Sequence, residues 1–398
     1  MKILLCHNFY QQPGGEDQSF AEEALLLESR GHEVIRFTRH NDAIQEMSSW
    51  DVAKRTFWSS ESHNDLRSIL QREQPDVMHC TNTFPLISPA AYYAAREERV
   101  AVVQSLRNYR MFCPGTYFMR DGKVCEDCLG RRFAWPAIVH KCYRESRAGS
   151  AVLASMIAMH RSLGTWSKLV DRYFALTNFS RAKFIEGGLP GEKIDVKPNF
   201  LLEDPGAGNG DGGYAVFVGR LSTEKGVGIL LNAWSQLESP PLLKIIGDGP
   251  MANEVKEAAT RNPNKIHWLG RLDRARVLDE VGNAACLLQP SLWYEGFPRT
   301  ILEAFSRGTP VIASRLGSME EIVVDGKSGI LCEPTAEAFR IAVEQFFGNP
   351  NAIPMMRFEA RQRFEECYSA AANYDKLMDI YAKAIAIAAK RSSDLTMK

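Results

Sequence analysis

The feature that most constrains the fold is an alternation of short apolar runs with amphipathic helical stretches, which occurs in two separate series. Apolar runs of the length of buried strands occur in the first series at 3–6, 34–38, 76–81 and 100–106. In the second series they occur at 215–218, 242–246, 266–269, 286–289 and 310–313. Buried strands that alternate with helices are typical of parallel sheets covered on both faces. The sequence therefore predicts an α/β fold with two doubly wound, Rossmann-like domains.

A segment of linker composition, DPGAGNGDGG at 204–213, separates the two series. We expect an N-terminal α/β domain at 1–200, with an insertion near 113–142, and a C-terminal domain at 214–365. The closing helical stretch at 366–398 is expected to pack back on the first domain. Ligands of doubly wound sheets bind beyond the carboxyl ends of the strands, so two facing domains would place a cleft between those ends.

The composition excludes several classes of protein. With 48 Lys and Arg against 48 Asp and Glu, the net charge is zero, and no global field draws the chain to nucleic acid. No apolar run approaches the roughly 20 residues that span a bilayer, and the N-terminus lacks a signal-peptide pattern. Nine cysteines, an odd number, argue against a disulfide framework. We therefore expect a cytoplasmic protein.

Two carboxylates flank a predicted helix start in WYEGFPRTILE, at 293–303. Glu295 precedes a Gly-Phe-Pro turn, and Glu303 lies on the second turn of the helix. Pro298 fits the first helical position, so the backbone amides around it would face the open helix end, where anions are favoured. These amides belong to Gly296, Phe297 and Arg299. The two carboxylates suit hydroxyl-rich groups on either side of an anion.

A second motif, GRLSTEKG at 219–226, follows another strand of the same predicted sheet. It places the cations Arg220 and Lys225 at the sheet edge that carries the helix start. Together with the helix amides they suit a diphosphate. A surface Arg, and a Lys paired with Glu224, is the alternative for this motif alone.

These motifs resemble those of the retaining glycosyltransferases of family 4, which have the GT-B fold of two facing Rossmann-like domains. The resemblance spans nearly the whole chain and rests on PGGE, GRLSTEKG, IIGDGP, IHWLGR, the E-x7-E pair and LGSMEEIVVDGKSGIL. It implies that the chain is a hexosyltransferase that moves a sugar from a UDP- or GDP-sugar with retained configuration. The implied acceptor is a glycan or a lipid-linked molecule, in the synthesis of a cell-surface polysaccharide, lipopolysaccharide or glycolipid.

The resemblance also implies roles for individual residues. The catalytic set would be Arg220, Lys225 and Glu295, with the two cations stabilising the departing diphosphate. The donor would be bound by Gly14, Gly15, Gly247, Gly249, Arg271, Gly296, Phe297, Arg299 and Glu303. The acceptor side would hold Glu16, His79, Asn82 and Arg107. Because cations and amides can stabilise the leaving group in place of a metal, no cofactor is expected to be required for catalysis.

Two positions depart from the family pattern. Arg107, in QSLRNYR, stands where related sequences commonly carry a His, and Thr81 stands where a second His is common. A guanidinium cannot act as a base. Arg107 therefore predicts either an ion pair with an internal acid such as Glu16, or contact with an anionic group on the acceptor.

Two further segments predict sites outside the catalytic motifs. A C-x11-C-x2-C-x13-C spacing is compatible with a structural zinc, with four reduced cysteines in a loop as the alternative and an iron–sulfur cluster less favoured. The segment 131–147 has five Lys or Arg, one acid and interleaved apolar residues. It predicts either a solvated face or peripheral contact with anionic lipid at the inner face of the membrane. The cysteines are Cys113, Cys125, Cys128 and Cys142, and His140 could replace one of them.

Rival functions remain open from the sequence. A glycoside hydrolase could use Glu295 and Glu303 as its acid pair, but it would leave Arg220 and Lys225 without a purpose. A nucleotide-sugar epimerase differs because its product forms without acceptor. A non-catalytic sugar-nucleotide binder is the alternative from another class, and slow donor hydrolysis would argue against it. A Rossmann dehydrogenase is not favoured, because no G-x-G-x-x-G follows the first strand.

Overall fold

The computed structural model describes residues 1–12 and 14–396, so Pro13 of the expected PGGE turn lies outside the described residues. The chain divides into two compact units. Unit 1 contains Met1–Tyr117, Glu126–Pro198 and the chain from Asn373 onward, and unit 2 contains Phe118–Cys125 and Asn199–Ala372. Phe118–Cys125 therefore groups with unit 2, although it lies inside the stretch expected in the first domain.

Unit 1 is built on a parallel sheet in the order β2-β1-β3-β4-β7-β8. The two central strands are buried along their whole length, as expected for a sheet covered on both faces. The strands are β1 (Lys2–Phe9), β2 (Glu33–His40), β3 (Val77–Asn82), β4 (Ala101–Leu106), β7 (Arg172–Ala175) and β8 (Ile194–Val196).

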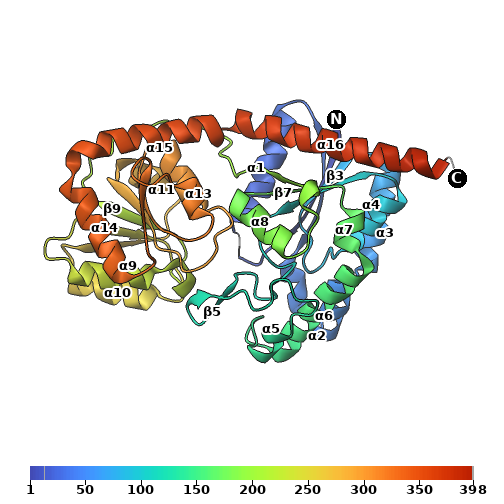
Figure 1. Ribbon diagram of the computed structural model, residues 1–398, viewed down its shortest axis with the longest axis horizontal. Helices are drawn as coiled ribbons and strands as arrows, with labels where there is room; N and C mark the ends of the chain where they lie inside the picture. Colours follow the sequence, from blue (N-terminus) through green and yellow to red (C-terminus); the bar gives the residue numbers. More distant parts are fainter. Residues whose placement is uncertain (13, 397–398) are drawn as a thin grey trace. The chain divides into compact units, whose positions relative to one another are not determined.

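The helices of unit 1 cover both faces of this sheet (Figure 1). They are α1 (Gly15–Ser29), α2 (Ser49–Phe57), α3 (Ser60–Glu73), α4 (Ala90–Glu97), α5 (Trp135–Val139), α6 (Arg147–Leu163), α7 (Thr165–Leu169) and α8 (Asn178–Glu186). The long helix α16 (Ala370–Thr396), drawn red in Figure 1, adds Tyr374 and Tyr381 to unit 1. Their hydroxyls contact His32 and His79, at 2.7 and 2.9 Å from a ring nitrogen.

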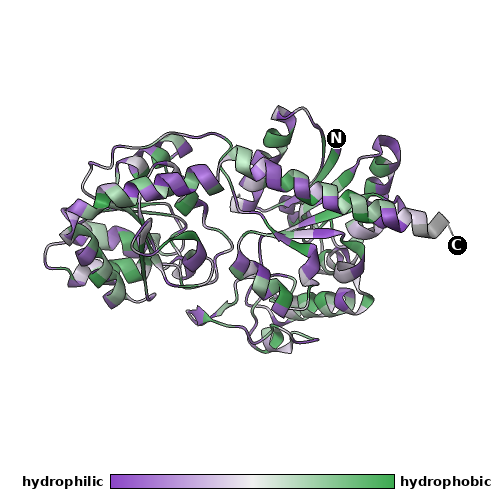
Figure 2. Cartoon of the chain, turned by 45° about the horizontal axis from the view of Figure 1, so that its top comes forward, coloured by the Kyte–Doolittle hydropathy of each residue, from purple (hydrophilic) through white to green (hydrophobic). Residues whose placement is uncertain are grey.

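Unit 2 repeats the plan with a parallel sheet in the order β11-β10-β9-β12-β13-β14. Apolar residues of α9 and α14 pack on one face of it in a common core, and Figure 2 shows hydrophobic residues, in green, along its strands. The strands are β9 (Ala215–Val218), β10 (Leu243–Ile246), β11 (Ile266–Gly270), β12 (Cys286–Gln289), β13 (Val311–Ser314) and β14 (Gly329–Cys332). The helices are α9 (Val227–Gln236), α10 (Ala252–Arg261), α11 (Arg274–Asn283), α12 (Arg299–Ser306), α13 (Met319–Ile322), α14 (Ala336–Gly348) and α15 (Ile353–Cys367).

The expected fold class is confirmed: both units are doubly wound α/β structures. Three strands were not predicted from the sequence, namely β7, β8 and β14. They have three or four residues each, and two of them contain a charged residue, so no long apolar run marks them. A two-stranded antiparallel hairpin, β5 (Met119–Arg120) with β6 (Lys123–Val124), was also not expected.

Among the described residues, no helix combines the length and the apolar character needed to cross a membrane.

Candidate functional site

Two loops at the carboxyl edge of the unit 2 sheet are fixed to each other. The loop after β9 carries Lys225, and the loop after β12 carries Glu295. The amide of Leu292 donates to the carbonyl of Glu224 at 2.9 Å. Gly226 has a φ of +74°, and a Cβ there would lie 1.9 Å from the carbonyl oxygen of Pro290. Only glycine permits this approach, so the two loops hold their functional side chains in a fixed relation.

The carboxylate of Glu295 is buried and oriented by four donors, all of which point at its Oε1 atom. Lys225 Nζ lies 2.7 Å away and Ser291 Oγ 2.7 Å away. Trp293 Nε1 donates at 3.1 Å and Gln289 Nε2 at 3.4 Å. The partner of Lys225 is therefore Glu295 and not Glu224, which accepts from Ser222 instead.

Arg220 contributes a second positive charge at the same sheet edge. It follows β9 directly and is exposed. Within the described part of the chain, its side chain has no hydrogen bond or ion pair with another residue. A guanidinium in this position keeps all its donors for an external anion.

The helix that follows Glu295 begins one residue later than expected. Pro298 is the N-cap, with an extended ψ of 116°, and α12 runs from Arg299 to Ser306. Proline fits either position because its fixed φ suits both. Phe297 is buried, its ring packs edge-on against Tyr368 at 5.2 Å, and its carbonyl accepts from Asn199. Half-buried Glu303 lies further along α12.

The packing of the loop after β10 requires glycine at two positions, a structural requirement that the sequence analysis did not consider. Gly247 has a φ of +136°, and a Cβ there would lie 1.9 Å from the carbonyl oxygen of Gly219. A Cβ on Gly249 would lie 2.5 Å from the carbonyl oxygen of Leu221. Both glycines therefore let this loop pack against the loop that carries Arg220, and their contact with a nucleotide stays a prediction. Arg271 is exposed beside the loop, with its Nε 3.6 Å from a carboxylate oxygen of Asp248.

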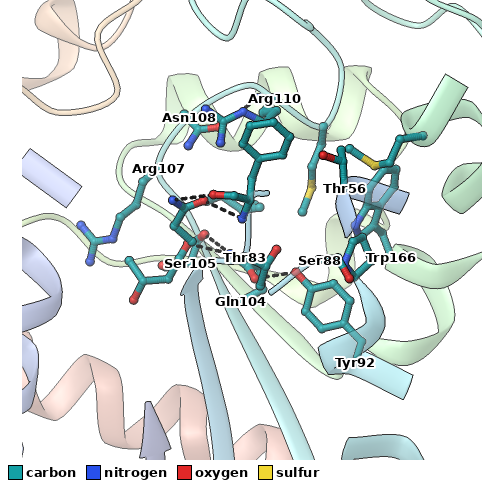
Figure 3. Close-up of a pocket in the computed structure, with 17 residues that line it drawn as sticks. Thr56, Thr83, Ser88, Tyr92, Gln104, Ser105, Arg107, Asn108, Arg110 and Trp166 are labelled. Carbon is teal, nitrogen blue, oxygen red and sulfur yellow. Dashed lines mark hydrogen bonds between the residues drawn. The ribbon is translucent and has the colours of Figure 1, made fainter. Parts of the chain in front are cut away.

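Unit 1 has a cavity of about 70 Å³ at the carboxyl ends of β3 and β4. Figure 3 shows its lining of hydroxyl, amide and aromatic side chains, including Gln104 and Tyr92, and Asn82 also belongs to the lining. Tyr92 donates to Gln104 at 2.7 Å, and Gln104 donates in turn to the backbone carbonyls of Thr81 and Ser105. In Figure 3 the guanidinium of Arg107 points away from the other labelled residues. Two of the predicted acceptor-side residues, Asn82 and Arg107, thus line this cavity.

Arg107 pairs with Glu23, not with Glu16 as the sequence analysis suggested. Its Nη2 lies 2.9 Å from Glu23 Oε1, and Lys197 Nζ lies 2.6 Å from the same oxygen. All three side chains are buried. Burial raises the pKa of Glu23, but Lys197 and Arg107 outweigh it and bring the pKa down to about 2. Burial lowers the pKa of Lys197 to about 8, against the attraction of Glu23. This geometry favours an internal ion pair for Arg107 over contact with an acceptor.

His79 is fully buried beside this charge cluster, which consists of Glu23, Arg107 and Lys197. Its Nδ1 lies 2.9 Å from the hydroxyl of Tyr381. Burial lowers the pKa of His79 to about 4, and the nearby cations add to this while Glu23 opposes it. A neutral, interior imidazole orients its neighbours within unit 1, and the geometry gives it no surface on which to meet an acceptor.

The start of α1 holds the remaining unit 1 candidates. Gly14 is the N-cap of the helix, which begins at Gly15, and the amide of Gly14 donates to Asp17 Oδ2 at 2.8 Å. Apart from its chain neighbours, no described atom lies within 4 Å of the position that a Cβ on Gly14 would take. Glu16 accepts from the hydroxyl of Tyr10 at 2.9 Å and from the amide of Asn108 at 2.8 Å.

The four spaced cysteines do not form a recognisable metal site. Among the described residues, no group of three or more His, Cys, Asp and Glu side chains is placed to hold a metal ion. Cys128 and Cys142 instead pack in a small apolar cluster with Ala134 and Ala137. The zinc expectation is not supported, and the packing explains at least two of these thiols as core residues.

The sequence analysis missed part of the polar network around Glu295. Gln289, Ser291 and Trp293 all donate to it, and Thr300 donates to Gln289 at 3.0 Å. One signal was present. Gln289 ends an otherwise apolar buried strand, and an amide in such a place needs polar partners.

Comparison with known proteins places these features in a family. The model of the "Glycosyl transferases group 1" family matches residues 203–366, and that of the "Glycosyl transferase 4-like domain" matches residues 14–199. The uncharacterized glycosyltransferase MJ1178 of Methanocaldococcus jannaschii is 34% identical over 125 residues, 31% of this chain and 35% of that protein. Glycogen synthase of Mycobacterium tuberculosis is 31% identical over 154 residues, 37% of each chain. The chain thus spans about a third of the length of these curated relatives.

Among solved structures, Anabaena HepE in complex with UDP superposes with a TM-score of 0.67 at 17% identity, over 96% of this chain and 100% of that one. At this identity the likeness shows the fold alone, which is the GT-B type expected from the sequence. The two family models lie side by side and together cover most of the chain. The chain therefore belongs to the group 1 glycosyltransferases, with a glycosyltransferase 4-like N-terminal domain.

Proposed function

We propose that this protein is a retaining, metal-independent hexosyltransferase that moves a sugar from a nucleotide-sugar donor to a glycan or lipid-linked acceptor. The observation that carries the proposal is the pair of loops at the carboxyl edge of the unit 2 sheet, which are joined by the hydrogen bond between Leu292 and Glu224. They hold Lys225 on the buried carboxylate of Glu295, and the exposed Arg220 follows β9 at the same edge. Such an edge is where ligands of doubly wound sheets bind.

The leaving diphosphate is the group that these residues suit. In the transition state, positive charge builds at the anomeric carbon and negative charge on the departing phosphate oxygens. Arg220 and Lys225 would stabilise that negative charge, because preorganised cations are the largest available electrostatic contribution. The amides of Gly296, Phe297 and Arg299, at the start of α12, would add to it. Glu295 would hold both Lys225 and a hydroxyl of the donor sugar.

Glu303 and Arg271 complete the proposed donor site. A carboxylate on α12 can accept hydrogen bonds from the vicinal hydroxyls of a ribose, and Arg271 follows the strand beside the Gly247 loop, where a base could stack. UDP is the nucleotide that accompanies the similar fold of HepE, which supports testing UDP-sugars before GDP-sugars. The identity of the transferred hexose and the pathway, whether polysaccharide or lipopolysaccharide, are left to experiment.

On the acceptor side, the cavity at the ends of β3 and β4 is the best-supported site in unit 1. Its hydroxyl and amide lining suits a polar, hydroxyl-bearing group. Arg110 lies at this cavity with its guanidinium 4.2 Å above the ring of Phe84, and Asn108 links the cavity to Glu16 at the start of α1. Arg110 and Asn108 therefore join the acceptor-side residues expected from the sequence as candidates; Arg107 also lines the cavity, whereas His79 is fully buried.

A screen of nucleotide sugars by thermal shift is the first experiment, because a ligand that binds only the folded protein raises its melting temperature. Donor hydrolysis and transfer to candidate acceptors are then measured with the donor that binds. Binding without any turnover would favour a non-catalytic binder, and product without acceptor would favour an epimerase. Activity that survives EDTA is expected. Activity that disappears with EDTA and returns only with magnesium or manganese would contradict the metal-independent mechanism.

A further inference from the structure

We propose that unit 1 docks on anionic lipid bilayers through one basic and aromatic surface, formed by the loop before α5, by α5 itself and by the loop that leads to α6. We call it the docking surface. Its exposed apolar side chains are Phe133, Trp135 and Val139, and its exposed cations are Arg131, Arg132, Lys141, Arg144 and Arg147. Vesicle binding needs neither donor nor acceptor, so this inference is independent of the proposed activity.

The apolar part of the docking surface projects from a short helix. Trp135 and Val139 are one turn apart on α5, so they lie on the same side of it, and they are 51% and 53% exposed. Phe133 is 40% exposed just before the helix. Three large apolar side chains thus reach solvent within seven residues, which is unusual for a surface that has no partner.

The opposite side of the segment is firmly attached to unit 1. Ala134 and Ala137 are buried in a cluster with Ala154 of α6, and α5 packs along α6, beside which it lies in Figure 1. The guanidinium of Arg161, also on α6, donates to the backbone carbonyl of Arg131 at 2.8 Å. The apolar side chains are therefore presented by a supported element and are not the inward face of a helix left without its core.

The charges select the partner. Five cations and one acid, Glu145, occur within 131–147, whereas the whole chain has no net charge. The guanidinium of Arg131 lies over the ring of Trp135, 5.5 Å from its centre, so cation and aromatic ring reach the same place. An exposed Trp and Phe within a segment rich in exposed Lys and Arg suit the boundary between acyl chains and anionic headgroups. A second copy of this chain, which has no net charge, offers these cations no matching excess of acids.

Co-sedimentation with vesicles tests the proposal. The protein is mixed with vesicles of phosphatidylcholine, with or without phosphatidylglycerol, at low and high salt. We expect binding to the anionic vesicles only, weakened by salt because the attraction is partly electrostatic. Lipids with brominated acyl chains should quench part of the tryptophan fluorescence, since Trp135 enters the acyl boundary. Binding equally well to neutral vesicles, or no binding at all, would overturn the proposal.

Two double variants with matched controls locate the surface. Trp135→Ser with Val139→Ser, and Arg132→Glu with Lys141→Glu, should each lower vesicle binding by about tenfold or more. Their controls change equally exposed residues of unit 2: Met355→Ser with Phe358→Ser on α15, and Lys256→Glu with Arg261→Glu on α10. Both controls should bind like the parent protein.

The remaining outcomes distinguish a lipid bilayer from other partners of this surface. All substituted side chains are exposed, so the melting temperature of each variant should equal that of the parent. If the test variants and controls lose binding alike, the docking surface is wrong. If the parent is a dimer that the Trp135 variant converts to monomer, the surface is an interface between copies. If an RNA homopolymer binds as tightly as the anionic vesicles do, the cations are not a lipid-specific feature, and the proposal falls.

Discussion

The two units each contain a lysine held on a buried glutamate, and the surroundings of the two pairs are opposite. In unit 2, Lys225 lies 2.7 Å from Glu295 and its side chain is 26% exposed. In unit 1, Lys197 lies 2.6 Å from Glu23 and its side chain is 1% exposed. The same contact therefore leaves one ammonium open to an external anion and encloses the other. A lysine–glutamate distance alone does not distinguish a ligand site from a structural one; the access of solvent to the cation does.

The enclosed pair should matter most for stability. Glu23→Gln leaves Arg107 and Lys197 as two buried cations without their carboxylate, and it should destabilise unit 1 by about 3–5 kcal/mol. Denaturant unfolding measures the loss. The matched control on the same helix is Glu28→Gln, which breaks the solvent-exposed pair with Arg36 and should cost about 0–1 kcal/mol. Equal costs for the two variants would show that the cluster is not the stabilising element inferred here.

The open pair should matter most for turnover. Lys225→Ala and Arg220→Ala should each lower kcat by roughly 10²–10³, because the charge they stabilise exists mainly in the transition state. Donor affinity should change far less, and steady-state kinetics with saturating donor separates the two effects. Lys256→Ala, an exposed lysine on α10, serves as the control and should keep parental kcat. Near-parental kcat in the Lys225 variant would remove its catalytic assignment.

The enclosed cluster should also make stability depend on pH through His79. In the folded protein its pKa is lowered to about 4, whereas the ordinary value is 6.5. Between these values the unfolded chain binds a proton that the native chain does not, so the stability due to His79 falls as the pH drops from about 6.5 to 4. The loss amounts to at most about 3 kcal/mol.

Denaturant midpoints across this pH range measure the effect. His79→Gln, which keeps a polar partner for Tyr381, should flatten this part of the pH profile. The control His267→Gln removes an exposed histidine of unit 2 and should leave the slope unchanged. An equal slope in the His79 variant would mean that other groups carry the acid sensitivity.

The smallest effect is expected at Arg271, whose side chain is mostly exposed beside Asp248. Arg271→Ala should change the free energy of unfolding by no more than about 0.5 kcal/mol. If it contacts the base of the donor, KM for the donor should rise while kcat is kept. An unchanged KM would place the base elsewhere and leave the catalytic assignments of the open pair intact.

The donor-side candidates could be selected from the sequence because they lie close together along the chain. Arg220 and Lys225 share one loop, and Glu295 and Glu303 flank one helix start, so residue type and spacing alone suggest a common site. The one-residue error at the start of α12 arose because proline suits both the N-cap and the first helical position.

The enclosed cluster could not be predicted in the same way. Glu23 and Lys197 are 174 positions apart. Glu23 lies in a helix with several other acidic residues, so its residue type gives no sign in the sequence that it is buried. Arg107 was recognised as unusual, but its partner could be named only after the sheet had brought β4 and α1 together. The short strands β7 and β8, which carry Phe174 to the cluster and precede Lys197, also lacked a local signal.

The composition of unit 1 from separate stretches of the chain has a consequence for synthesis on the ribosome. Asn199–Ala372 is synthesised before the residues from Asn373 onward, although those later residues belong to unit 1. At roughly 5–20 residues per second, this interval lasts on the order of tens of seconds. During this interval His79 lacks the hydroxyl of Tyr381, and the part of unit 1 already synthesised lacks α16. The first unit to begin is thus the last to be finished.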